Sequence, residues 1–506
     1  MTFPSAGCQT CKLRRIKCDE TQPVCQRCMK SGRMCQGMRR PGSVVHSENS
    51  YASGNKKRPR GPRSTFAVEA MRSSKPAPQH GLVDLKAEAT GYYVHYYLQS
   101  LPNILDISKS VLDDFMPIWL SKAENRMLDL ALSSMALAVF SQARQHTRAA
   151  LDASTNYQQL LRTTRGTICS LYEGNIDAWL LAIFFMSRYE QVVHLPRQRH
   201  STATSAVNLQ TFSHHDGALA ILKTWKESLS HYHPPTSIIK HTRRGMIRSA
   251  LLRKLALPDW ILDGAAFGEE GWELEYDYLS VRITNLRYQV SLLVKEAATQ
   301  DTSPEFTSAA RALNNEACEI DNGLKVWNSR FPHAWSTQRH TLSDPPPLPT
   351  TFFYSSTVLT CSSVAYTAVW SQYYAMRMLH NSTHLKILGL CHPNPDAFDE
   401  TQRLECVSCV ENMANDLASS IPFSLKKFEV VDNTNSSEDQ TLVTMITNDD
   451  LKPPLASMTV WPLSIASCLG DVKVEQRLWF RDILSRLGRM LGDRVIESEG
   501  DQWFEL

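Results

Sequence analysis

Six cysteines with a repeated spacing stand near the start of the chain. They are Cys8, Cys11, Cys18, Cys25, Cys28 and Cys35. The pattern C-x2-C-x6-C occurs twice, in CQTCKLRRIKC and in CQRCMKSGRMC, with an offset of 17 residues. Thiolates bind soft metals, and two tetrahedral Zn²⁺ ions need about eight ligand positions, so six thiols suffice if two of them bridge both ions. Chance clustering and redox thiols are the alternatives, and two matched units favour a site for two zinc ions.

The predicted metal site would also stabilise the head of the chain. A segment of about 30 residues buries too little apolar surface to fold alone. Structural zinc contributes roughly 10–16 kcal/mol per site in small peptides. The first residues lack the apolar segment of a signal peptide, and the longest strongly apolar run, 179–186, is far too short to span a membrane. We therefore expect an intracellular protein without a membrane partner, in a reducing compartment where clustered cysteines bind metal.

The charge is unevenly divided along the chain. Residues 1–75 hold 16 Lys and Arg against 4 Asp and Glu, whereas residues 76–506 carry a net charge of −9. A basic head on an acidic body is typical of a module that binds a polyanion and is attached to another domain. A basic disordered tail is the alternative, and the cysteine spacing favours the binding module.

The residues after Cys11 predict a short helix over 12–17 that could enter a DNA groove. Leu13 and Ile16 would share the face toward the metals. The basic residues Lys12, Arg14, Arg15 and Lys17 would then point outward. The second unit has Lys30 and Arg33 inside it, so the first unit is the better candidate for the major groove. Arginine suits bidentate contact with guanine.

The cysteine spacing over residues 8–35 resembles the fungal Zn(II)2Cys6 binuclear cluster family of transcription factors. The resemblance implies that Cys8 and Cys25 bridge, that Cys11 and Cys18 complete one zinc site, and that Cys28 and Cys35 complete the other. It also implies that Arg15, three residues before the third cysteine, reads a CGG-type triplet. Arg14 and Lys17 are the next candidates for base contacts, whereas Lys12, Arg27, Lys30 and Arg33 are expected to contact phosphates.

Residues 36–81 are expected to form a flexible linker because they contain prolines and glycines and lack apolar periodicity. The basic run KKRPRGPR at 56–63 suits nuclear import or additional phosphate contacts. Many family members carry a dimerising coiled coil after the cluster, but we find no heptads here. The alternatives are binding as a monomer and dimerisation through the large domain.

From residue 82 onward, apolar periodicity predicts an all-helical domain. A seam of Tyr276, Leu279, Ile283, Leu286, Val290 and Leu293 is too short for a coiled coil and favours a core helix. Other helices are expected at 84–100, 128–139, 176–194, 215–230, 243–256, 304–328, 353–380, 400–420 and 473–491. Loops are expected near 196–211, 333–350 and 424–455.

The large domain resembles, diffusely over 85–495, the fungal-specific transcription factor regulatory domain. GYYVHYY at 91–97, HHDGALAIL at 214–222 and WPLSIA at 461–466 carry the resemblance. The domain lacks the G-x-S-x-G, H-E-x-x-H, P-loop and dinucleotide-binding motifs of common enzymes. A further metal site from Cys391, His392, Cys406 and Cys409 is the less favoured interpretation, because the first pair lacks ligand spacing.

These observations predict an all-α protein with a Zn(II)2Cys6 domain at 1–40, a basic linker at 41–81 and a helical regulatory domain at 82–506. We expect a nuclear, zinc-dependent regulator of RNA polymerase II transcription that binds double-stranded DNA and contacts the transcription machinery. The family's usual targets are secondary-metabolite or catabolic gene clusters. A homodimer through the large domain and a small-molecule effector are further expectations. The alternative function is a metabolite-binding protein or enzyme with a vestigial cluster.

Overall fold

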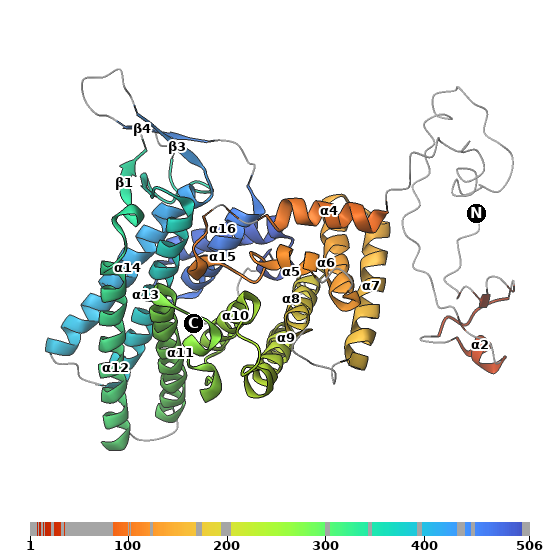
Figure 1. The fold of residues 1–506 in the computed structure, drawn as a ribbon, viewed down its shortest axis with the longest axis horizontal. Coiled ribbons are helices and arrows are strands. Elements are labelled where there is room, and N and C mark those ends of the chain that lie inside the picture. Colours follow the sequence, from red (N-terminus) through yellow and green to blue (C-terminus); the bar gives the residue numbers. More distant parts are fainter. Residues whose placement is uncertain are drawn as a thin grey trace. The chain divides into compact units, whose positions relative to one another are not determined.

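Helices make up most of the described residues in the computed structural model of the chain (Figure 1). The described residues are 8, 10, 11, 14, 16–21, 25–31, 35, 84–99, 101, 103–121, 125–167, 175–193, 204–298, 304–342, 347–391, 397–432, 441–446 and 451–497. The chain divides into two units, Met1–Leu82 and Val83–Leu506. The predicted all-α class is confirmed, whereas the finer division at 1–40, 41–81 and 82–506 stays a prediction.

The first unit contains the short helix α2 (Gln26–Lys30), and the second unit is the helical body. The helices of the body are α4 (Leu85–Tyr97), η1 (Asp106–Ser108), α5 (Phe115–Ser121), α6 (Arg126–Ala143), α7 (Thr147–Thr167), α8 (Ile176–Val193), α9 (Thr204–Thr224), η3 (Trp225–Leu229), α10 (Ser237–Arg253), η4 (Asp259–Ile261), η5 (Ala265–Phe267), α11 (Gly271–Ala297), α12 (Pro304–Ser329), η6 (His333–Trp335), α13 (Val364–Cys391), α14 (Ala397–Ser424), α15 (Pro453–Cys468), α16 (Val474–Leu491) and α17 (Arg494–Glu497). Its strands are β1 (Gln338–Thr341), β2 (Thr357–Thr360), β3 (Phe428–Asp432) and β4 (Thr441–Met445).

The body has two large apolar cores. One is built mainly from α4 to α9, and the other mainly from α11 to α16. Helix α10 lies between the two groups (Figure 1) and contributes Ile239 and Met246 to the first core and Leu251 to the second. Helix α10 therefore belongs to both cores.

The predicted core helix over 276–293 is confirmed as part of α11. All six apolar residues of the seam are buried, and they pack with apolar residues of α12 and α13. The stripe from Leu128 to Val139 is likewise buried in α6. Apolar residues at spacings of three and four predicted these helices because they place one stripe against the core.

Two short antiparallel hairpins correct the expected loops and one expected helix. Strands β1, β3 and β4 lie inside the predicted loops, and β2 occupies residues that were expected to be helical. Three of the four residues of β2 are β-branched, and Val358 among them is fully buried. Val358 packs with Phe353 and with Phe428 of β3. Residues distant in sequence therefore determine that this segment is a strand, and local periodicity does not reveal them.

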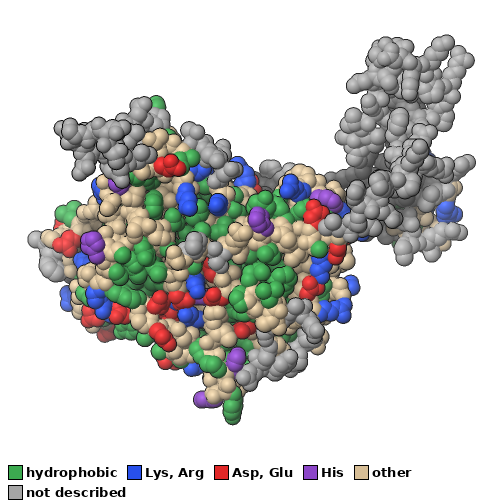
Figure 2. Space-filling view, turned by 45° about the horizontal axis from the view of Figure 1, so that its top comes forward, with side chains coloured by type: hydrophobic (Ala, Val, Ile, Leu, Met, Phe, Trp, Pro, Cys, Tyr) green, Lys and Arg blue, Asp and Glu red, His purple; other side chains and the backbone are tan. Residues whose placement is uncertain are grey.

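Other boundaries also differ from the expected ones. Helix α9 begins at Thr204, inside the predicted loop 196–211, and α13 begins at Val364 instead of at residue 353. Helices α7 and α15 were not predicted. None of the described helices is long and apolar enough to span a membrane. On the face in Figure 2, the body intermixes acidic, basic and apolar side chains.

A buried ion pair fixes α10 against α11. Arg243 is fully buried, and its Nη1 and Nη2 donate to the two carboxylate oxygens of Asp277 at 2.6 and 3.0 Å. The guanidinium also donates to the carbonyl oxygens of Ile261 and Leu262 at 2.8 and 3.2 Å. A Cβ atom at Gly264 would collide with the Asp277 carboxylate. The pair is therefore both enclosed and hydrogen-bonded, so removing one partner leaves a buried charge uncompensated.

We predict that Asp277→Ala lowers the free energy of unfolding by roughly 3–5 kcal/mol. The matched control is Asp152→Ala, which breaks the exposed pair of Arg148 with Asp152 and should cost about 0–1 kcal/mol. Urea unfolding of the full chain, followed by the helical circular dichroism signal, measures both. Equal losses in the two variants would contradict the role of burial.

Candidate metal and DNA-binding site

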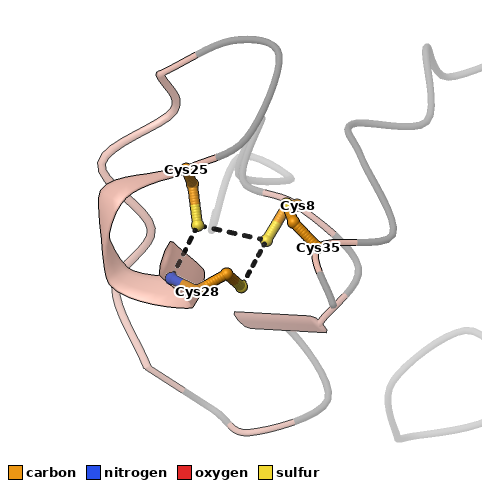
Figure 3. Close-up of side chains that lie close together, drawn as sticks. All are labelled: Cys8, Cys25, Cys28 and Cys35. Atoms are coloured by element: carbon orange, nitrogen blue, oxygen red, sulfur yellow. Dashed lines mark hydrogen bonds between the residues drawn. The ribbon is translucent and has the colours of Figure 1, made fainter. Parts of the chain in front are cut away.

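The six cysteines of the head converge into two groups of four. Cys8, Cys11, Cys18 and Cys25 form one group, and Cys8, Cys25, Cys28 and Cys35 form the other. Within each group, all sulfur atoms lie within 4.8 Å of one another. The two groups share Cys8 and Cys25, so the six thiols offer eight ligand positions. Figure 3 shows the second group, in which dashed lines join the Cys8 sulfur to the sulfurs of Cys25 and Cys28.

The distances between the sulfur atoms fit zinc. Cys8 Sγ lies 3.7 Å from Cys25 Sγ and 3.8 Å from Cys28 Sγ. Cys11 Sγ lies 3.7 Å from Cys25 Sγ. Tetrahedral coordination with Zn–S bonds of about 2.3 Å requires sulfur atoms roughly 3.8 Å apart. The cluster can therefore hold two zinc ions, as the spacing predicted, and zinc is the cofactor of this head.

The sequence repeat produces a repeated local structure. The backbone N–H of Cys11 donates to Cys8 Sγ at 3.4 Å, and that of Cys28 donates to Cys25 Sγ at the same distance. Cys25 is thereby the N-cap of α2. Each C-x2-C unit thus turns its backbone around its first sulfur, and this turn places the second sulfur beside it.

Crowding of the sulfur atoms changes their pKa values. The Cys11 N–H favours the Cys8 thiolate, but burial and neighbouring thiols together raise the pKa of Cys8 to about 12. Burial also raises the pKa of Cys11. By contrast, the backbone N–H groups of Cys8 and Glu20 lower the pKa of Cys18. Cys8 and Cys11 would therefore keep their protons at neutral pH without a metal, and zinc binding must release them.

Asp19 supports the second unit, a role that the sequence analysis missed. Its carboxylate accepts from the backbone N–H groups of Gln26 and Arg27 at 3.0 and 3.2 Å, and also from the Thr21 hydroxyl. These hydrogen bonds, the Thr21 bond foremost, lower the pKa of Asp19. The acceptor satisfies N–H groups at the start of α2. An aspartate next to Cys18, before a helical segment, was the available signal.

The basic residues assigned to DNA are only partly described. Arg14, Lys17, Arg27 and Lys30 are described and exposed, and Arg14 Nη1 donates to the Ser31 hydroxyl at 3.5 Å. Ile16 packs against the cysteines, as expected, but Ile16 and Lys17 are not helical, so the helix predicted over 12–17 is wrong at its C-terminal end. The remaining predicted residues, Lys12, Leu13, Arg15 and Arg33, lie outside the described residues, as do the predicted linker and its basic run.

The cysteines of the body form a different environment. Cys406 Sγ lies 3.4 Å from His384 Nδ1, and Cys391 is buried in the second core. Among the residues that the structure describes, no cysteine of the body belongs to a group of three ligands suited to a metal. Burial raises the pKa of Cys406 to about 12, mainly because the thiolate would lose its hydration. His392 lies outside the described residues.

Comparison with known proteins supports the assignment of the head. Residues 6–43 match the family model of the fungal Zn(2)-Cys(6) binuclear cluster domain. The resemblance of the body to the fungal-specific regulatory domain stays a prediction. No solved structure matches the chain.

Three curated relatives are named as transcription regulators. An uncharacterised transcriptional regulatory protein of Schizosaccharomyces pombe is 33% identical over 153 residues, which are 28% of this chain and 24% of that protein. The aspercryptin biosynthesis cluster-specific transcription regulator atnN of Emericella nidulans is 58% identical over 6% of this chain and 5% of its own length. The transcriptional regulatory protein moc3 of S. pombe is 48% identical over 9% of this chain and 11% of its own length. The chain thus matches less than a quarter of each relative, and its head carries the fungal binuclear zinc cluster domain.

Proposed function

We propose that this chain is a nuclear, sequence-specific regulator of RNA polymerase II transcription whose DNA binding depends on zinc. The observation that carries the proposal is the pair of four-thiol groups that share Cys8 and Cys25, in a basic head. Structural zinc would fold the head and hold its basic residues in place. The three relatives named as transcription regulators support the same function.

In the proposed cluster, Cys8 and Cys25 bridge the two ions. Cys11 and Cys18 complete one tetrahedron, and Cys28 and Cys35 complete the other. The membership of the two thiol groups supports this division. Sulfur atoms suit zinc, and a closed tetrahedron leaves no position for a substrate, so the cluster has a structural role.

In the proposed complex with double-stranded DNA, Arg15 donates to guanine in a CGG-type triplet, with Arg14 and Lys17 beside it. Lys12, Lys30 and Arg33 contact phosphates, which position the head without specifying sequence. The exposure of Arg14, Lys17 and Lys30 supports this assignment. Phosphate contacts also make the affinity fall steeply with salt.

The body is proposed to regulate this activity and to act without catalysis of its own. It would contact the transcription machinery, join a second copy of the chain and respond to a small-molecule effector. The proposed targets are genes of a secondary-metabolite or catabolic cluster. The name of the relative atnN, a regulator specific to a biosynthesis cluster, supports the first of these.

We predict that Cys8→Ser and Cys25→Ser lose both zinc ions, because each bridging thiolate belongs to both tetrahedra. Cys361→Ser is the matched control, since Cys361 is a buried cysteine of the body and its loss should leave two zinc ions per chain. Native mass spectrometry and elemental analysis measure the stoichiometry. Two zinc ions retained in the Cys8 variant would rule out the proposed bridge.

We predict that Arg15→Ala loses discrimination between a selected DNA site and a scrambled one by about 5- to 150-fold, while two zinc ions stay bound. Arg27→Ala removes an exposed cation of α2 and should weaken binding to both sequences alike. Fluorescence anisotropy at one fixed salt concentration measures the two affinities. Should selectivity survive the loss of Arg15, another residue reads the bases.

A further inference from the structure

Asp19 joins the two cysteine units of the head without a metal. It directly follows Cys18, the last residue of the first cysteine unit, 8–18. Its Oδ2 accepts from the backbone N–H of Gln26 at 3.0 Å, and its Oδ1 accepts from that of Arg27 at 3.2 Å. Both N–H groups belong to α2 in the second cysteine unit, 25–35. One carboxylate therefore connects the end of the first unit to the start of α2.

Thr21 holds this carboxylate in place. Its hydroxyl donates to Asp19 Oδ2 and also accepts from the backbone N–H of Gln26 at 3.1 Å. The carboxylate oxygen, the hydroxyl and the N–H group thus form a closed ring of hydrogen bonds. This ring restricts rotation of the Asp19 side chain.

The first N–H groups of α2 are divided between Asp19 and a zinc ligand. Those of Gln26 and Arg27 donate to Asp19, whereas that of Cys28 donates to Cys25 Sγ at 3.4 Å. A helix of five residues has few hydrogen bonds of its own and is not stable in isolation. The carboxylate and the metal ligand therefore hold its first turn together.

Metal ligation alone leaves the direction of α2 open. Zinc would fix the sulfur atoms of Cys25 and Cys28, but each sulfur is joined to the backbone through single bonds that rotate between staggered positions. At the other end of α2, Arg14 Nη1 reaches the hydroxyl of Ser31, the C-cap, at 3.5 Å. That distance is at the long limit for a hydrogen bond. The shorter hydrogen bonds to Asp19 thus contribute most to the direction of the helix.

The direction of α2 matters because its surface carries two cations. Arg27 and Lys30 are both exposed. Residues three apart on a helix lie on the same side, so the two cations point in a similar direction. Phosphate contacts set the register of a protein on a duplex. These cations can contribute such contacts only if α2 presents them at the correct angle to the first cysteine unit.

We propose that Asp19 is a positioning residue for DNA binding. It acts through the first turn of α2 and directs Arg27 and Lys30 toward phosphates, while the first cysteine unit contacts the bases. This inference rests on the proposed function. The hold on α2 is measured without DNA, so its failure and the failure of DNA binding are distinguishable.

The first test measures hydrogen exchange of the zinc-loaded full chain without DNA, by mass spectrometry of peptides that cover 25–31. Asp19→Ala should exchange at least about twofold faster there and should keep two zinc ions. Asp19→Asn retains an acceptor oxygen and should exchange more slowly than Asp19→Ala. The matched control is Glu20→Gln, which removes the same charge from the neighbouring exposed residue and should exchange as the unaltered chain does. Unchanged exchange in Asp19→Ala, or loss of its zinc, overturns the proposal.

The second test measures how the DNA affinity of the zinc-loaded chain depends on salt. Asp19→Ala should lower the slope of log affinity against log salt by roughly 1 to 2, because phosphate contacts of α2 are lost. The ratio of affinities for a selected and a scrambled site should stay within about twofold, because phosphate contacts carry no sequence information. Glu20→Gln should keep the slope of the unaltered chain.

A double variant shows whether Asp19 acts through the cations of α2. Lys30→Ala alone should lower the salt slope by about 1. Added to Asp19→Ala, the same change should lower the slope no further, because the contact of Lys30 is already lost. An unaltered slope in Asp19→Ala, or a full effect of Lys30→Ala in its presence, overturns the proposal. Absence of DNA binding by the unaltered chain would instead contradict the proposed function.

Discussion

Sharing six thiols between two tetrahedral metal ions is the constraint on which the head of this protein depends. Four sulfur atoms around each zinc must lie about 3.8 Å apart, and Cys8 Sγ meets Cys25 and Cys28 at 3.7 and 3.8 Å. So small a segment has little apolar surface with which to position its basic side chains. The direction in which Arg14 and Lys17 point is therefore set by metal ligation more than by a hydrophobic core.

The metal site could be predicted from the sequence because its chemistry is local. In each C-x2-C unit, the second backbone N–H bonds to the first sulfur, so two identical spacings give two identical turns. The role of Asp19 was harder to predict, because it depends on hydrogen bonds from the backbone N–H groups of Gln26 and Arg27, which lie seven and eight residues further along the chain. The recognition residue Arg15 follows from the family resemblance and stays a prediction.

In the body, periodicity predicted the helices that bury one stripe, such as α11, but not features that depend on distant partners. Strand β2 forms because Val358 packs with Phe353 and with Phe428, which belongs to β3 of the second hairpin. The buried pair of Arg243 and Asp277 is a still stronger case, since its two side chains come from α10 and α11 and the carbonyl acceptors come from Ile261 and Leu262. Nothing in the sequence around Arg243 distinguishes it from the neighbouring Arg244; only the folded chain shows which carboxylate each arginine meets.

The proposed account gives the two units different tasks, with a zinc-folded head for DNA and an acidic helical body for regulation. Its central claim is that zinc organises a head that reads sequence. The most direct measurement is selection from randomised duplexes by the full chain, zinc-loaded in one arm and zinc-stripped in the other. The account predicts that the loaded chain enriches a G/C-rich triplet and that the stripped chain enriches none. Equal enrichment in the two arms, or none by the loaded chain, would contradict it.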